Sequence, residues 1–120
     1  MSYISGFVIP VPTDRKEDYR KMAADAAEMF RAYGATEIME AWGEDVRDGK
    51  VTDFKRAVQA KDDETVVFSW IVWPDRATAD AAEKKMEADE SMKPPADAPF
   101  DMKRMIWGGF APIFEMGRQE

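Results

Sequence analysis

Two repeat lengths of apolar and polar positions divide the chain into strands and helices. Residues 3–11 carry apolar side chains on both faces of a two-residue repeat, which predicts a strand covered on each side. After Asp14, a typical helix cap, apolar residues recur every three or four positions as far as Gly34, a typical residue just past a helix end. This stretch is the most regular helix pattern in the sequence.

The middle of the chain predicts strands with a hairpin inserted among them. Residues 35–45 have the pattern of a second strand. In residues 52–60 the pattern fits a helical turn as well as a strand. We favour the strand, because the polar residues 61–64 then make a hairpin loop into the next run. That run, residues 65–73, is almost entirely apolar and β-favouring, so it predicts the strongest strand in the chain.

The last part of the chain predicts a helix, an irregular stretch and a strand. Asp75 is a good cap for a helix at about residues 76–90, whose apolar stripe consists mostly of small residues. Residues 92–100 are proline-rich and predict either a stiff cover or a plain connection. A final strand is expected over residues 104–115, where Gly108 and Gly109 indicate a bulge or the close approach of another backbone.

This order predicts a single α+β domain over residues 1–120 with a ferredoxin-like split βαβ arrangement. The expected sheet is antiparallel, carries an inserted hairpin strand, and has two helices on one face. Since the strands are apolar on both faces, the face without helices also needs a cover. A second copy of the sheet is the simplest cover, so we expect a homodimer.

Charge and composition exclude several classes of function. The chain has 17 basic and 24 acidic residues and a net charge of −7, which repels phosphate backbones and disfavours a nucleic-acid partner. The apolar runs are far too short to span a membrane. With no cysteine, nothing requires an oxidising compartment, and we expect a soluble cytoplasmic protein.

The absence of both histidine and cysteine narrows the chemistry further. It excludes Ser-His-Asp and Cys-His nucleophiles, zinc sites built from imidazole or thiolate, and a haem held by either residue. No glycine-rich phosphate loop is present, and no carboxylate cluster has calcium-loop spacing. A hard metal held by carboxylates alone stays open as an alternative, and we expect no metal and no cofactor.

Three segments carry a resemblance to a known family: Tyr-Ile-Ser-Gly-Phe-Val at 3–8, Val-Val-Phe-Ser-Trp-Ile-Val-Trp-Pro at 66–74, and Lys-Arg-Met-Ile-Trp-Gly-Gly-Phe at 103–110. With these segments the chain resembles the YbaA-like bacterial family of domains of unknown function, in the dimeric α/β-barrel group of ferredoxin-like folds. The resemblance covers nearly the whole chain. It implies a dimeric, cytoplasmic bacterial protein, and it implies no established activity or catalytic residue.

Tryptophan residues are the first candidates for a binding site, since the chain has 4 of them. On the strand pattern, Trp42, Trp70 and Trp107 are expected on the sheet face away from the helices, and Trp73 on the face opposite to Trp70. The three tryptophans on the same face would form an aromatic pocket for a flat or apolar small molecule. The alternative is that they fill the core of a dimer.

Isolated charges in the strands are the second group of candidates. Glu40 shares its face with Ile38 and Trp42, so its carboxyl is expected to have a raised pKa and to be able to act as a proton acceptor. Arg56 and Arg104 interrupt apolar strand faces and could anchor an anionic molecule. The alternatives are exposed edge positions for all three residues, or pairing of Glu40 with one of the arginines.

Three hypotheses about function follow. The first is a homodimer that binds a small apolar or anionic molecule. The second is a cofactor-independent enzyme of oxygenase or isomerase type, with Glu40 as the base and Arg104 or Arg56 holding the developing anion; it depends on analogy between folds. The third is a dimer that serves only structure or interaction.

Overall fold

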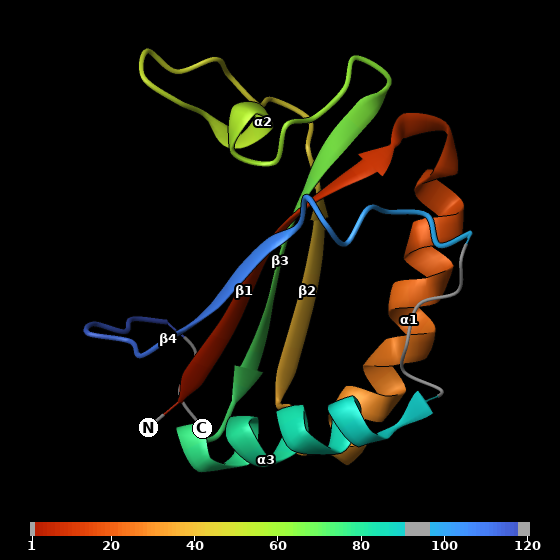
Figure 1. The fold of residues 1–120 in the computed structure, drawn as a ribbon. Helices are drawn as coiled ribbons and strands as arrows, with labels where there is room; N and C mark the ends of the chain where they lie inside the picture. Colours follow the sequence, from red (N-terminus) through yellow and green to blue (C-terminus); the bar gives the residue numbers. More distant parts are fainter. Residues whose placement is uncertain (1, 91–96, 118–120) are drawn as a thin grey trace.

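A computed structural model describes residues 2–90 and 97–117 and shows an α+β fold (Figure 1). Strands and helices follow the order that the sequence pattern predicts, except in the connection between the second and third strands of the sheet. In chain order the elements are β1 (Tyr3–Pro12), a 3-10 turn (Thr13–Arg15), α1 (Lys16–Ala32), β2 (Glu37–Trp42), α2 (Phe54–Ala57), β3 (Glu64–Trp73), α3 (Arg76–Ala88) and β4 (Ile106–Phe110).

The strands form a four-stranded antiparallel sheet in the order β2-β3-β1-β4. Its register is fixed by cross-strand pairs that run through all four strands. In the central row, Met39 pairs with Trp70, Trp70 with Gly6, and Gly6 with Gly108. Paired residues point to the same face of a sheet, so rows such as this one determine which side chains share a face.

Both long helices lie on one face of the sheet, which we call the helix side. In Figure 1, α1 runs alongside the strands and α3 crosses them at one end. Tyr19 of α1 packs in a cluster with Ile9, Val11 and Val67. Small residues of α3, Ala79 and Ala82, allow a close approach to Ile71 and Trp73.

The signals at the helix ends are partly confirmed. Gly34 follows α1 with a φ of 112°, a conformation that favours glycine. Asp75 caps α3, since its side chain accepts the N–H of Thr78 at 2.7 Å. The expected cap at Asp14 is wrong, because this residue lies in the 3-10 turn that precedes α1.

The strand that we favoured for residues 52–60 is also wrong, and with it the inserted hairpin strand. The segment holds the single helical turn α2, which Asp53 caps by accepting the N–H of Arg56 at 2.8 Å. Phe54 of this turn packs edge-on against Phe68, with ring centroids 6.1 Å apart. The cap at Asp53 and the contact of Phe54 with Phe68 therefore favour a helical turn in residues 52–60, whose apolar pattern fitted a helix and a strand equally well.

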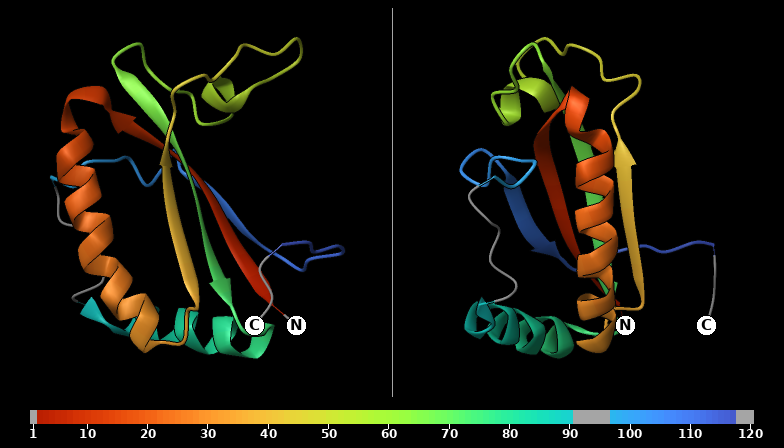
Figure 2. Two further views of the ribbon diagram at one scale, coloured as in Figure 1. Left: turned by 180° about the vertical axis from the view of Figure 1, so that it is seen from behind. Right: turned by 90° about the vertical axis from the view of Figure 1, so that its right-hand side faces the viewer.

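The C-terminal end of the chain differs from the expected strand as well. β4 pairs with β1 without a break from Ile106 to Phe110, so there is no bulge at the two glycines. A side chain at Gly109 would collide with the Tyr3 hydroxyl, which explains why this position is occupied by glycine. Beyond β4, residues 111–117 leave the sheet instead of continuing the strand (Figure 2). Residues 91–96 of the proline-rich stretch lie outside the described residues.

None of the helices in the described part of the chain is long and apolar enough to cross a membrane.

Candidate functional site

Glu40 lies in the row of the helix side that crosses the middle of the sheet. It pairs with Ser69, Ser69 with Phe7, and Phe7 with Trp107. Because β2 is an edge strand, Glu40 as a residue remains exposed. Its carboxylate nevertheless reaches inward and accepts a hydrogen bond from the Tyr19 hydroxyl at 2.7 Å.

The pKa values of the Glu40 carboxyl and the Tyr19 phenol are shifted mainly because these two groups are largely removed from water. Desolvation raises the pKa of the Glu40 carboxyl and outweighs the opposite effect of the hydrogen bonds from Tyr19 and Ser69. Burial likewise raises the pKa of the Tyr19 phenol, and the Glu40 charge and hydrogen bond raise it further. A carboxyl of raised pKa, oriented by two hydroxyls, can accept a proton from a group that reaches the β2 edge.

The partners of Glu40 are not those considered from the sequence, since it pairs with neither Arg56 nor Arg104. The sequence pattern placed Tyr19 simply among the apolar residues of a helix stripe. Ser69 did leave a signal, because it is the only polar residue between Val66 and Trp73. A lone hydroxyl in such a strand indicates a buried polar partner.

The expected cluster of tryptophans does not form. Trp70 lies on the face away from the helices and Trp73 on the opposite face, as expected. Trp42 and Trp107, however, lie on the helix side, because they pair with Val67 and Phe7. The Trp42 ring faces the Lys16 ammonium, 5.4 Å from the ring centroid. Which tryptophans share a face depends on the register between strands, and the two-residue repeat of a single strand does not reveal that register.

Arg104 is engaged with carboxylates. Its guanidinium donates to both oxygens of Glu64 at 2.7 Å, to Asp101 at 2.8 Å and to the Gln59 carbonyl at 2.9 Å. The side chains of Arg104 and Glu64 are only 16% and 7% exposed, and the bidentate pair lowers the pKa of the Glu64 carboxyl. Arg104 therefore joins the start of β3 to the turn before β4.

Arg56 has a similar local role. It donates to the Asp53 carboxylate at 3.0 Å and to the carbonyls of Val51 and Gly49, all within the connection between β2 and β3. These contacts hold the loop that carries α2. Most N–H donors of both arginines therefore form hydrogen bonds that hold the fold together.

The face of the sheet opposite to the helices, which we call the open face, is apolar and largely uncovered. Phe54 of α2 covers only one end of it, where it contacts Phe68, and the Phe68 and Trp70 rings lie tilted to each other with centroids 5.5 Å apart. Its single carboxylate in the three central rows, Glu37, accepts the Trp70 indole N–H at 3.2 Å. Those rows contain Phe110–Ile4–Val72–Glu37, Gly108–Gly6–Trp70–Met39 and Ile106–Val8–Phe68–Ala41.

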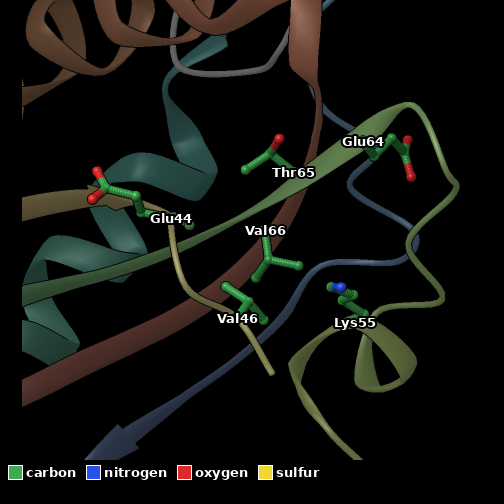
Figure 3. A pocket seen from close by; sticks show the side chains of 7 residues that line it. Glu44, Val46, Lys55, Glu64, Thr65 and Val66 are labelled. Atoms are coloured by element: carbon green, nitrogen blue, oxygen red, sulfur yellow. The ribbon is translucent and has the colours of Figure 1, made fainter. Parts of the chain in front are cut away.

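A small pocket of about 180 Å³ opens beside α2, at the start of β3 (Figure 3). Its volume is below the roughly 300 Å³ at which ordinary ligand sites begin. None of the residues singled out from the sequence contributes to its walls. The pocket is lined by Gly43, Glu44, Val46, Lys55, Glu64, Thr65 and Val66.

These features define an α+β protein with helices on one side of a four-stranded sheet, an apolar open face, and a part-buried carboxyl–phenol pair. The chain belongs to the family described as "Protein of unknown function (DUF1428)", whose model matches residues 2–102.

Individual relatives support the same assignment. "Uncharacterized protein YbaA" of Escherichia coli (strain K12) is 53% identical over 116 residues, which is 96% of this chain and 99% of that protein. The protein of the same name from Shigella flexneri matches equally well. The resemblance to a YbaA-like bacterial family is therefore confirmed, and the family has no assigned function.

Proposed function

We propose that the chain works as a homodimer of ferredoxin-like subunits, a dimeric α/β barrel, that holds a flat apolar molecule between its two sheets. The observation that carries this proposal is the open face. Large apolar side chains on it stay about half exposed in the single chain, among them Met39, Phe68, Ile106 and Phe110. Monomeric proteins rarely leave so continuous an apolar surface in water.

The width of such a barrel favours a ligand cavity. Two four-stranded sheets supply eight strands, and eight strands enclose an interior that is either filled by side chains or holds one small ligand. Gly6 and Gly108 lie side by side at the centre of the open face and contribute no side chain to fill it. The Phe110 ring lies over both, since a Cβ on either would be 3.4 or 3.5 Å from it.

The lining chemistry suits an uncharged aromatic molecule. Trp70 and Phe68 present ring faces and edges, and Met39 offers an adaptable thioether. We place no anion here, because Arg56 and Arg104 are occupied by carboxylates. A cytoplasmic location is part of the proposal, since a chain without cysteine needs no oxidising compartment.

Binding of an uncharged fluorescent naphthylamine tests this proposal. We expect a dimer in sedimentation experiments and saturable binding of about one probe per dimer, because the cavity would lie on the two-fold axis. Gly108→Val should weaken binding at least tenfold by displacing the Phe110 ring from its place over the two glycines, while its Cβ itself meets only ordinary contacts. Ala24→Val, on the exposed side of α1, is the matched control.

A monomer, or a dimer whose probe binding is unchanged by Gly108→Val, would contradict the proposed cavity. A stable dimer that binds no probe would favour the purely structural dimer instead.

A second candidate function, proton transfer by Glu40, is favoured by its hydrogen bond from Tyr19 and by its raised pKa. As a base it must be deprotonated, so its activity would rise as the pH passes upward through its pKa. Tyr19→Phe removes a hydrogen bond that stabilises the carboxylate, and should therefore move this pKa higher. Titration of the Glu40 carboxyl carbon by NMR measures both values without a substrate.

Glu40→Gln should remove this titration and abolish any turnover found. An ordinary glutamate pKa in the natural protein, or no shift in Tyr19→Phe, would remove Glu40 from consideration as a base.

A further inference from the structure

The chain has a second uncovered apolar feature beyond β4. Residues 111–117, which we call the C-terminal arm, leave the sheet and project on the side opposite to α1, as both figures of the fold show (Figures 1 and 2). Ile113 is fully exposed, and Phe114 and Met116 are more than four-fifths exposed. A hydrogen bond from the Ser2 hydroxyl to Glu115 at 3.1 Å connects the arm to the start of the chain.

The opposite end of the open side carries a matching apolar surface. There the loop around α2 exposes Val51, at 90%, and Phe54, at 49%. In Figure 1 this loop and the arm both project on the open side, at opposite ends of the strands. We call Val51 and Phe54 the α2 rim.

We propose that the C-terminal arm of each copy packs against the α2 rim of its partner, so that the two chains meet face to face with opposite ends together. This inference rests on the proposed homodimer and adds its orientation. A two-fold axis in the interface and perpendicular to the strands brings the arm of each copy to the rim of the other, twice per dimer. Both apolar sets are then covered by the same operation.

The area needed for a stable dimer supports a role for the arm. Four strands paired over about five residues give a plane of about 330 Å². A standard interface buries about 800 Å² on each partner. The flat plane leaves out the relief of the side chains that stand on it, and the three exposed large side chains of the arm would add further apolar area to the interface. The arm would therefore strengthen a dimer that forms through the open face.

Charging the arm tests its contribution. Ile113→Asp with Phe114→Asp should weaken dimerisation at least 100-fold in sedimentation equilibrium, because each dimer loses two copies of both contacts. The subunit should stay folded, since both side chains are exposed in the single chain. Ala24→Asp, on the solvent side of α1, is the control and should leave the dimer unchanged.

Introduced cysteines test the orientation, and the natural chain has none to interfere. A short bifunctional maleimide should link Val51→Cys/Ile113→Cys into covalent dimers and leave each single-cysteine variant unlinked. Linking by Ile113→Cys alone would place arm against arm and overturn the inference. A natural dimer that the charged arm does not weaken would overturn the inference and leave the proposed dimer standing. A natural chain that is monomeric would overturn both.

Discussion

Replacing Trp73 by alanine should destabilise the fold by about 4 kcal/mol, the usual cost of removing a large buried aromatic side chain. Trp73 is 1% exposed and packs between the sheet and α3, against Ala79 and Ala82. Its indole N–H also donates to the Ser5 hydroxyl at 3.0 Å. The substitution therefore leaves a cavity and an unpaired hydroxyl at the junction of two layers.

Urea denaturation at a fixed protein concentration measures this loss, since association would otherwise change the apparent stability. Trp107→Ala is the matched control, because Trp107 is also on the helix side but 63% exposed. It should change the free energy of unfolding by less than about 1 kcal/mol. Similar losses for the two variants would mean that Trp73 is not the central core residue that its burial indicates.

Replacing Phe68 by aspartate should convert the proposed dimer into a folded monomer. Phe68 contacts Phe54 and Trp70 and lies in the row of the open face next to the central row, so the dimer would bury two unpaired carboxylates near its axis. Buried unpaired charges cost several kcal/mol each, which corresponds to a loss of affinity of at least about 1,000-fold. In the single chain Phe68 is 46% exposed, so the new carboxylate can remain in water and the fold should persist.

Sedimentation equilibrium and circular dichroism together test this expectation, with Ala24→Asp as the control of equal charge. A Phe68→Asp protein that remains dimeric would show that the chains meet through another surface. A variant that is monomeric because it is unfolded would be identified by its spectrum. In that case Met39→Lys, at the edge of the same face, provides the second measurement.

The period of the sequence determined which elements form, because periodicity is a local property of the chain. The strand at β3 and the helix at α1 follow from runs of apolar residues with repeats of two and of three to four. The separation of Trp70 from Trp73, and the shared face of Glu40 and Trp42, follow from the same repeat. The absence of histidine and cysteine likewise limited the available chemistry without any structure.

Where the local signal was ambiguous, tertiary contacts decided. Residues 52–60 fitted two periods equally well, and the Asp53 cap with the contact between Phe54 and Phe68 resolved the choice in favour of α2. The arm beyond β4 had the apolar composition of a strand, yet it does not pair within its own sheet. Composition alone does not say whether a strand partner is present.

The sequence by itself thus determined most of the elements and the relative sides of residues within each strand, but not the helical turn α2 or the end of β4. Only the tertiary structure decided which of the two sides faces the helices, because that depends on register across strands distant in the chain. The register placed Trp42 and Trp107 with Glu40 on the helix side, and left Trp70 on the open face. The tertiary structure also brought Tyr19 of α1 to the Glu40 carboxylate of β2. The apolar repeat within neither element predicts this contact.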